Sequence, residues 1–257
     1  MSTPRTRPRV LCLGGLDPSG GAGLAADLDA VRARGGHALP LCTALTVQSN
    51  RAAGRVEATA IKLLTEQFDA LEAEAPIAAI KVGLLASAAQ VRWLAERLRH
   101  DNTPLVLDPV LYASGGQPLS GEPVMRALRR QLLPRVTVLT PNHVEALALV
   151  PGSSGVEAAG AALRRAGCQQ VLITGGDQAG CDVVDCWWPD HGPMRRFRQA
   201  RVPGTFRGTG CRLAAALATG LAHGLPPLEA LKRARRYLRD SLRSGYTAAP
   251  GAAFPGR

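Results

Sequence analysis

The sequence predicts one α/β domain with a mostly parallel central sheet and helices on both of its faces. Short apolar runs rich in β-branched residues recur along the 257 residues and are bounded by Gly, Pro or Asp, which is typical of buried strands. Helix-length amphipathic segments lie between several of these runs, and this alternation favours parallel pairing. No linker, repeat or low-complexity stretch interrupts residues 1–257, so a single domain is expected.

The expected elements follow the chain in order. Buried strands are predicted where the bounded apolar runs occur, at 10–13, 39–45, 77–82, 105–107, 136–139 and 171–174. Helices are predicted at the amphipathic segments 24–34, 59–74, 88–99, 123–133 and 156–166. Residues 181–197 predict a hairpin, and 211–223 and 227–243 predict two closing helices. The segment 247–257 is rich in Ala, Gly and Pro and is expected to be a loosely ordered tail.

The positive charge is confined to the last quarter of the chain. The net charge is +11, and residues 195–257 hold 13 basic residues against only Glu229 and Asp240. A basic region attracts polyanions, which keeps a non-catalytic polyanion-binding protein as an alternative from another class. Aromatic residues make up only 4%, so the stacking platform of a single-strand nucleic-acid binder is missing. No nucleic-acid partner is therefore expected.

Apolar residues and cysteines disfavour membrane, zinc and disulfide classes. No apolar run approaches the ~18 to 20 residues of a membrane span, and the first residues lack the apolar region of a signal peptide. The six cysteines form no CxxC pair and have no His at ligand spacing. We therefore expect a cytoplasmic protein without a membrane partner.

The strongest local signal is the glycine-rich segment 14–23, with the sequence GGLDPSGGAG. It follows the first predicted strand and opens a helix that carries Asp27. Its five glycines allow the backbone to approach a ligand closely. The spacing matches neither a dinucleotide fingerprint nor a P-loop. The segment is therefore predicted to be a ligand-facing loop of another kind.

A second glycine segment, Arg207-Gly208-Thr209-Gly210-Cys211, runs directly into a helix of small residues. A helix start presents free N–H groups and the positive end of the helix dipole, which suits a phosphate. A cysteine there is expected to have a lowered pKa and to accept a proton. The alternative interpretation is a glycine turn with a packing cysteine.

Polar residues also follow three of the predicted strands, where open α/β sheets place their ligands. Asp108 ends one strand, Asn142 and Glu145 follow the next, and Gly175-Gly176-Asp177 follows a third. Each alone could be a helix cap or a turn residue. Together they form a set that could hold magnesium and polyphosphate.

Six motifs appear in the order found in one known family: GLDPSGGAGLAAD (15–27), TALTVQ (43–48), IKVGLL (80–85), LDPV (107–110), LTPNHVEA (139–146) and GTGC (208–211). Along nearly its whole length the chain resembles the hydroxymethylpyrimidine/phosphomethylpyrimidine kinases of thiamine biosynthesis, in the ribokinase-like superfamily. The resemblance implies a three-layer α/β fold and a homodimer. It also implies phosphorylation of 4-amino-5-hydroxymethyl-2-methylpyrimidine, and then of its monophosphate, with ATP and Mg²⁺.

The resemblance assigns the substrate side of the site by motif. Gly15, Asp27 and Gln48 should surround the aminopyrimidine, and Leu84 and Val110 should offer apolar contact. The amide of Gln48 suits a ring with adjacent donor and acceptor atoms. Gln48 and the complete DPSGGAG run favour the pyrimidine over the ring of a pyridoxal kinase, which is the alternative within the superfamily.

The resemblance assigns the phosphate side in the same way. Gly208, Thr209 and Gly210 should form an anion hole, with Cys211 as the catalytic group that takes the hydroxyl proton. Three of the polar residues that follow the predicted strands complete this side. Asp108 and Glu145 should lie near magnesium, and Asn142 should lie near the nucleotide phosphates.

Three positions depart from the pattern of the family. Arg207 stands where His is common, Arg212 where Thr or Ser is common, and Thr174 where many members have Lys. We expect these three residues to bind the nucleotide, with Arg207 or Arg212 supplying the positive charge that Thr174 lacks.

Overall fold

The computed structural model describes residues 6–50, 52–113 and 116–256. Its strands, in chain order, are β1 (Arg9–Leu16), β2 (His37–Gln48), β3 (Ala53–Ala58), β4 (Ala79–Val82), β5 (Leu105–Leu107), β6 (Val138–Leu139), β7 (Val171–Ile173), β8 (Asp182–Trp188) and β9 (Arg195–Ala200). Its α-helices are α1 (Gly23–Ala33), α2 (Ile61–Glu74), α3 (Ala88–Arg97), α4 (Glu122–Ala127), α5 (His143–Leu149), α6 (Val156–Arg165), α7 (Thr209–Ala222) and α8 (Pro227–Arg243).

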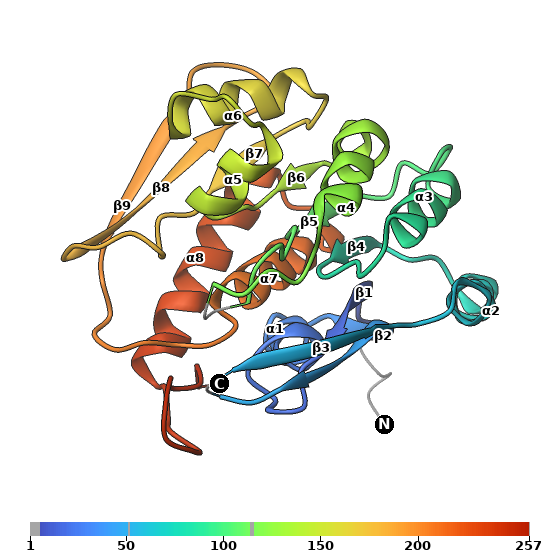
Figure 1. The fold of residues 1–257 in the computed structure, drawn as a ribbon, viewed down its shortest axis with the longest axis horizontal. Helices are drawn as coiled ribbons and strands as arrows, with labels where there is room; N and C mark the ends of the chain where they lie inside the picture. The colour runs from blue at the N-terminus through green and yellow to red at the C-terminus, as the bar shows by residue number, and fades with distance from the viewer. Residues whose placement is uncertain (1–5, 51, 114–115, 257) are drawn as a thin grey trace.

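The described strands form one continuous sheet in the order β3-β2-β1-β4-β5-β6-β7-β8-β9 (Figure 1). Neighbouring strands from β2 to β7 are parallel. At one edge β3 pairs antiparallel with β2, and at the other β7, β8 and β9 form antiparallel pairs. The sheet is thus mostly parallel with antiparallel edges, as predicted.

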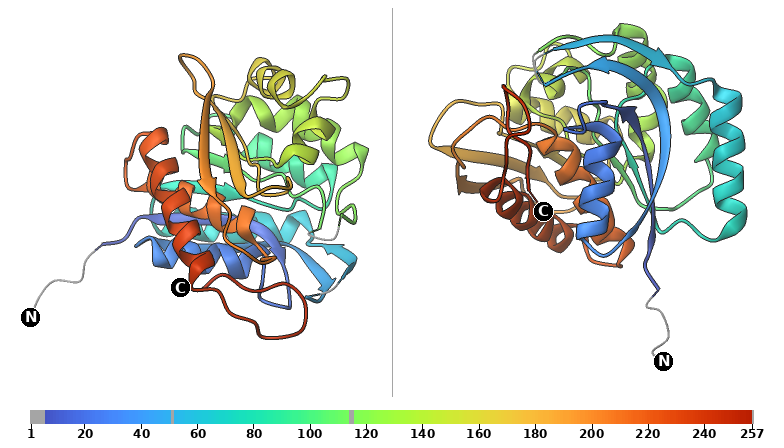
Figure 2. Two further views of the ribbon diagram at one scale, coloured as in Figure 1. Left: turned by 90° about the vertical axis from the view of Figure 1, so that its left-hand side faces the viewer. Right: turned by 90° about the horizontal axis from the view of Figure 1, so that it is seen from below.

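Helices cover both faces because the central strands are apolar on both sides. In β1, Val10 and Cys12 pack with α1, α7 and α8, whereas Leu11 and Leu13 pack with the core beneath helices α2 to α6. Successive side chains of a strand point to opposite faces, so one apolar run serves two cores. The view from below in Figure 2 shows α1 and α8 on one side of the curved β2 strand and α2 on the other. The three-layer architecture is confirmed.

Two elements were not predicted. The strand β3 has the sequence AGRVEA and lies at an edge, half-exposed or exposed, so it lacks the apolar signature of a buried strand. Helix α5 is short, and its first turn is a capping box in which Asn142 accepts from the Glu145 N–H and Glu145 accepts from the Asn142 N–H. A helix cap was one of the two interpretations of these residues, and the structure shows that both of them do cap α5.

The predicted helix at 123–133 is regular only in its first part. After α4 the chain widens into a π-helical turn at Leu128–Leu132 and then tightens into a 3₁₀ turn at Leu133–Arg135. Pro134 explains the change, because proline has no N–H to continue the helical hydrogen bonds and its ring crowds the preceding turn.

The C-terminal segment is held more firmly than the sequence suggested. Phe254 is 4% exposed and stacks on Tyr246 at a centroid distance of 5.7 Å. The Ala253 N–H donates to the Thr205 carbonyl, and the Gly256 N–H donates to the Ser241 carbonyl. Residues 252–256 are thus half-buried or buried, whereas residues 247–251 are exposed, and a loosely ordered tail stays a prediction for them. Arg257 lies outside the described residues.

The strand order reverses direction at β1, which has β2 on one side and β4 on the other. Open α/β sheets bind ligands outside the carboxyl ends of their strands at such a point. In the part of the chain that the structure describes, no helix combines the length and apolarity needed to cross a membrane.

Candidate active site

The two glycine segments meet at the carboxyl edge of the sheet. Gly208 precedes α7 in a left-handed conformation, with φ of 65°. A Cβ on Gly208 would lie 2.2 Å from the Gly21 carbonyl oxygen, so only glycine allows this approach. The segment after β1 and the start of α7 therefore form one continuous wall.

The first turn of α7 presents free backbone N–H groups to that edge. The first hydrogen bond inside the helix runs from the Arg212 N–H to the Gly208 carbonyl, at 3.0 Å. The N–H groups of Thr209, Gly210 and Cys211 come before it and have no helical acceptor. Together with the helix dipole they give this turn the character of an anion site.

A buried ion pair lies beneath this turn. Lys81 in β4 places Nζ 2.8 Å from Oδ1 and 2.9 Å from Oδ2 of Asp27 in α1, and both side chains are fully buried. Burial raises the pKa of Asp27 to about 6, against the opposing effect of Lys81. Burial disfavours the charge on Lys81, but Asp27, Cys211 and Asp108 outweigh it, so its pKa is raised. At neutral pH the pair is ionised.

Lys81 was missed at the level of the sequence as a site residue. Its signal is a lysine between Ile80 and Val82 in a strand whose four residues are all buried. A lysine in such a run needs a buried partner, and Asp27 is that partner. The space above Nζ is also restricted, because a Cβ on Gly83 would lie 2.9 Å from it.

Cys211 lies in the same cluster, and its thiol is more basic than we expected. Burial raises its pKa to about 12; Asp108 and Asp27 add to the rise, while Lys81 and the Gly23 backbone amide oppose it. The expectation that a helix start lowers this pKa is therefore wrong for the free protein. Burial and the neighbouring carboxylates thus raise this pKa rather than lower it, and the thiol keeps its proton at neutral pH.

Two further acidic residues, Asp108 after β5 and Glu145 in α5, interact electrostatically. Burial raises the pKa of Asp108, while Lys81 and the Cys211 thiol oppose the rise. Burial and the charge of Asp108 raise the pKa of Glu145 to about 7. Oδ2 of Asp108 is buried and has no hydrogen-bond partner among the described residues. Asp108 thus offers an unpartnered carboxylate oxygen to a cation, whereas both oxygens of Glu145 accept backbone hydrogen bonds, from Leu111 and Asn142.

These residues fit magnesium bound together with a nucleotide better than a cage made of protein alone. No group of three or more His, Cys, Asp or Glu side chains suited to a metal occurs in residues 6–50, 52–113 and 116–256. Mg²⁺ is commonly held by one or two carboxylates and by substrate phosphates, with water completing the shell. The orphaned Oδ2 of Asp108 satisfies that requirement.

The residues expected beside Asp27 around the pyrimidine lie at the carboxyl ends of four strands: Gly15 in β1, Gln48 in β2, Leu84 after β4 and Val110 after β5. A Cβ on Gly15 would come within 3.0 Å of the Leu84 side chain. Gln48 is half-buried at the end of β2, where its Oε1 accepts from the Thr46 hydroxyl at 3.4 Å. Val110 has φ of 41°, a left-handed value that β-branched residues rarely adopt. Such backbone strain is concentrated at functional sites.

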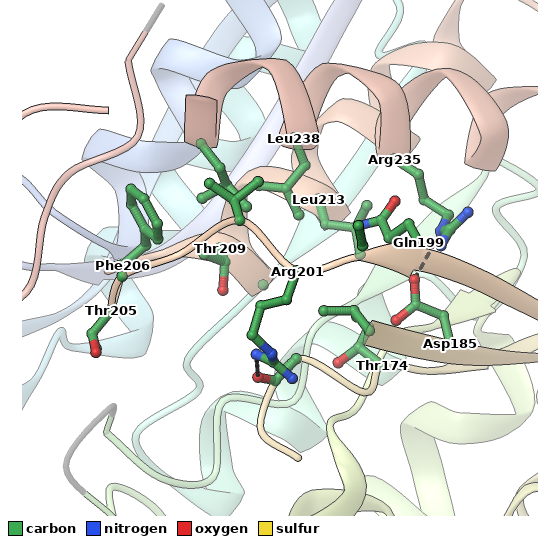
Figure 3. A pocket seen from close by; sticks show the side chains of 17 residues that line it. Thr174, Asp185, Gln199, Arg201, Thr205, Phe206, Thr209, Leu213, Arg235 and Leu238 are labelled. Atoms are coloured by element: carbon green, nitrogen blue, oxygen red, sulfur yellow. Dashed lines mark hydrogen bonds and ion pairs between the residues drawn. The ribbon is translucent and has the colours of Figure 1, made fainter. Parts of the chain in front are cut away.

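A cavity of about 260 Å³ opens on the outer side of the α7 turn, bounded by β8, β9 and α8 (Figure 3). Its lining includes Thr209 and Gly210 of the α7 turn, Thr174 at the end of β7, apolar side chains such as Leu213, Phe206 and Leu238, and the ion pair of Asp185 and Arg235. The cavity thus combines a turn with free N–H groups, an apolar compartment and a few charged side chains, a mixture typical of small-molecule sites.

Comparison with known proteins identifies the family of this chain. Residues 17–254 match the profile of a family described as phosphomethylpyrimidine kinase. The chain belongs to the phosphomethylpyrimidine kinase family. It is 35% identical over 240 residues to a hydroxymethylpyrimidine/phosphomethylpyrimidine kinase from Rhizobium meliloti, a match that covers 91% of this chain and 90% of the relative. The protein is therefore a phosphotransferase.

Solved structures agree on the fold. A phosphomethylpyrimidine kinase from Clostridium difficile superposes with a TM-score of 0.80 at 27% identity, covering 92% of this chain and all of that one. A pyridoxal kinase from Staphylococcus aureus in complex with ADP superposes with a TM-score of 0.87 at 24% identity, covering 98% and 93%. The second likeness shows the shared ribokinase-like fold alone.

Arg207 and Arg212, two of the three departures from the family pattern, do not line the cavity. The guanidinium group of Arg207 is buried and pairs with Asp17 at 2.8 Å. Arg212 is also buried, donates to the Gly21 carbonyl at 3.1 Å and pairs with Asp29 at 3.4 Å. Both guanidinium groups thus hold the segment after β1, and their expected contact with nucleotide phosphates stays a prediction.

Thr174 does line the cavity, at the end of β7. Asn142 lies beside it in an isolated parallel bridge and caps α5 with its side chain. The following loop is shaped by Arg201, which donates to the carbonyls of Gly176 and Gly180. In Figure 3 the Arg201 side chain points into this loop rather than along the cavity.

Proposed function

We propose that this kinase transfers the γ-phosphoryl group of ATP to 4-amino-5-hydroxymethyl-2-methylpyrimidine and then phosphorylates the monophosphate to the diphosphate, in thiamine biosynthesis. The observation that carries the proposal is the position of the first turn of α7. Thr209 and Gly210 face the nucleotide cavity, whereas Cys211 lies within the buried cluster with Asp27, Lys81 and Asp108. A phosphoryl group held by this turn lies between donor and acceptor.

The pyrimidine is proposed to lie between the segment after β1 and the ends of β2, β4 and β5. Asp27 and Gln48 provide an acceptor and an amide for the amino group and ring nitrogen. Gly15 leaves room for the ring, while Leu84 and Val110 contact its apolar edge. The Lys81 pair fixes the Asp27 carboxylate before the substrate binds, which reduces the entropy that binding must overcome.

The phosphates are proposed to bind the N–H groups of Gly208, Thr209 and Gly210, with Asn142 and Thr174 at the opposite end of the cavity. Asp108 and Glu145 would hold Mg²⁺, which when bound neutralises charge on the phosphate oxygens. Bringing a cation to these carboxylates requires that both be ionised, so binding should release protons near neutral pH.

Cys211 is proposed to take the hydroxyl proton. Phosphoryl transfer depends on in-line placement and charge neutralisation more than on a strong base, so the proton can leave late in the reaction. At neutral pH the thiol carries its own proton, because burial raises its pKa to about 12. That proton would have to pass to a neighbouring base before Cys211 accepts another, and the Asp108 carboxylate, which accepts a hydrogen bond from the thiol, is within reach. Lys81 and the Gly23 amide favour that loss, because both lower the pKa of Cys211.

We also propose that the protein is a cytoplasmic homodimer, on the strength of the resemblance between its motifs and those of the family. Sedimentation of the purified chain at micromolar concentration tests the dimer directly, and a monomer at all concentrations would contradict it.

The substrate is tested by measuring kcat/KM for the hydroxymethylpyrimidine and for pyridoxal with ATP and Mg²⁺. We expect the pyrimidine to be preferred, because Asp27 and Gln48 offer paired polar groups to an aminopyrimidine edge. A higher kcat/KM for pyridoxal would identify a pyridoxal kinase instead, and no turnover of either would refute the proposal.

A further inference from the structure

Arg207 joins two parts of the candidate site that are far apart in the chain. Its Nη2 donates to Asp17 Oδ2 at 2.8 Å, and both side chains are at most 5% exposed. Asp17 lies in the glycine-rich segment after β1, whereas Arg207 immediately precedes the turn at Gly208. We infer that Arg207 is a positioning residue that fixes residues 14–23, the pyrimidine loop, against the phosphate-binding turn. This inference rests on the proposed function for its kinetic part.

Asp17 is the residue through which Arg207 acts on the pyrimidine loop. Its Oδ1 accepts from the Ser19 N–H at 2.9 Å and from the Ser19 hydroxyl at 2.7 Å, and its Oδ2 accepts from the Ala22 N–H at 3.1 Å. The carboxylate thus organises the loop from within. Arg207 supplies the cation that a buried carboxylate needs, so the conformation of the loop depends on the ion pair.

Gly21 is the point at which the loop touches the Arg207 side chain. A Cβ on Gly21 would lie 3.0 Å from Nε and 3.2 Å from Cβ of Arg207, and 2.8 Å from the Phe254 ring. Nε of Arg207 is buried without a hydrogen-bond partner in the described part of the chain. Arg207 therefore lies closely packed between the loop and the C-terminal segment.

The C-terminal segment 246–256, which we call the strap, is hydrogen-bonded to the backbone of Arg207. The Arg207 N–H donates to the Ala253 carbonyl at 3.0 Å, and Phe206 and Ala253 form a parallel bridge. Further along the strap, Asn50 in the β2–β3 connection donates to the Ala252 carbonyl at 2.9 Å. In both views of Figure 2 the C-terminal segment folds back past α8 toward the N-terminal elements.

This arrangement sets the distance between substrate and phosphate. In-line transfer requires the hydroxyl oxygen to lie within a few tenths of an ångström of its reactive position, and a misplacement of ~1 Å can cost ~10²-fold in rate. The pyrimidine loop holds one reactant and the α7 turn holds the other. Arg207 and the strap connect both, so their removal should weaken pyrimidine binding before it affects the nucleotide cavity.

The test compares Arg207→Met, which keeps the packing but removes the charge, with Asp17→Asn, the double variant and the conservative Arg207→Lys. We expect Arg207→Met to raise KM for the pyrimidine roughly tenfold or more, with KM for ATP changed by less than about twofold. The double variant should be no worse than either single variant, because both remove one interaction. Arg207→Lys should recover part of the loss.

A second variant guards against a simple folding defect. Phe254→Ala leaves the ion pair in place but removes the ring that packs on Gly21, and it should increase amide hydrogen exchange across residues 17–23. Arg97→Gln is the matched control, because Arg97 pairs with Asp69 and Glu72 away from the site and should alter neither the exchange nor either KM.

Hydrogen exchange separates this inference from the proposed function, because it needs no substrate. Faster exchange of residues 17–23 in Arg207→Met and Phe254→Ala, but not in Arg97→Gln, supports the inference even if the wild-type protein does not turn over the pyrimidine. Unchanged exchange in both variants, or additive effects of the Asp17 and Arg207 variants on KM, overturns it.

Discussion

The two halves of the candidate site are built in different ways. On the pyrimidine side the polar groups are buried and paired, with Asp27 on Lys81 and Asp17 on Arg207. On the nucleotide side the cavity is open, and its loop is held by Arg201 through backbone carbonyls at a half-buried position. The two sides thus differ in exposure: the paired groups on the pyrimidine side are buried, whereas the loop beside the cavity, residues 176–180, is exposed.

Burial constrains the conformation of the two halves of the candidate site to different degrees. A buried ion pair contributes little net stability, because desolvation offsets the attraction between the charges, but it does specify one conformation. Most residues that line the cavity are half-buried or exposed, although Asp185 and Arg235 there also form a largely buried ion pair, with 2.8 Å between Oδ2 and Nε. Changes on the buried side should therefore act on pyrimidine binding and on the chemical step, and changes at the cavity should act on nucleotide affinity.

The largest effect is expected for Cys211→Ala. Removing the proton acceptor should lower kcat by about 10²- to 10⁴-fold and leave KM for ATP within about twofold, because the cavity is unchanged. Steady-state kinetics with both substrates measures the split. Cys181→Ala is the control, since Cys181 is exposed and free. Full activity in Cys211→Ala would remove this thiol from the mechanism.

A smaller loss, about 10- to 100-fold in kcat at saturating ATP, is expected for Asp108→Asn, because the carboxylate that would hold the cation is lost. The free protein should nevertheless become more stable at pH 8, since a buried carboxylate with an orphaned oxygen is costly. A gain of about 1 kcal/mol corresponds to a rise of ~2–4 °C in Tm for a chain of this size. Scanning calorimetry without Mg²⁺ measures it, and a lower Tm would contradict the account.

A pH-dependent change in stability follows from Glu145. Its pKa is raised to about 7 from the ordinary 4.5, so the stability gained by keeping its proton is present below pH 4.5 and is lost as the pH rises to 7. The free wild-type protein should thus lose stability between pH 5 and 8. Asp108→Asn should lose less, because the charge that helps to raise this pKa is gone. Equal losses in the two proteins would argue against coupling.

The smallest effect is expected on the open side. Thr174→Lys adds a cation at the end of the cavity, where many family members carry one, and should lower KM for ATP by roughly two- to fivefold without changing KM for the pyrimidine. Titration with a fluorescent ATP analogue measures the affinity. Thr174→Val controls for the loss of the hydroxyl, and an unaltered ATP affinity in Thr174→Lys would place the phosphates elsewhere.

Local patterns were sufficient to predict most of the architecture. Apolar runs bounded by Gly, Pro or Asp located the parallel strands because most of the side chains in these runs are buried. The edge strand β3 was not predicted because its sequence is half-polar. The irregular end of α4 was not predicted because the effect of Pro134 depends on the packed helix around it. Propensity is a weak guide where tertiary contacts decide.

The sequence could predict which residues belong to the site, but not which of their side chains pair with one another. The motifs identified Asp27, Asp108 and Cys211, yet the partner of a buried charge is a tertiary contact that no local pattern contains. Arg207 and Arg212 were therefore assigned to phosphates, although Asp17 and Asp29 bind them. Lys81 was overlooked for the same reason. The pKa of Cys211 also depends on burial, which outweighs the local effect of the helix start.

The central claim is tested most directly by a phosphorus-31 NMR time course of the wild-type protein with ATP, Mg²⁺ and the hydroxymethylpyrimidine. The account predicts that a phosphomonoester signal of the pyrimidine appears first and is then replaced by the signals of its diphosphate, with ADP formed in step. ATP consumption without a pyrimidine phosphate signal, or no consumption at all, would contradict it.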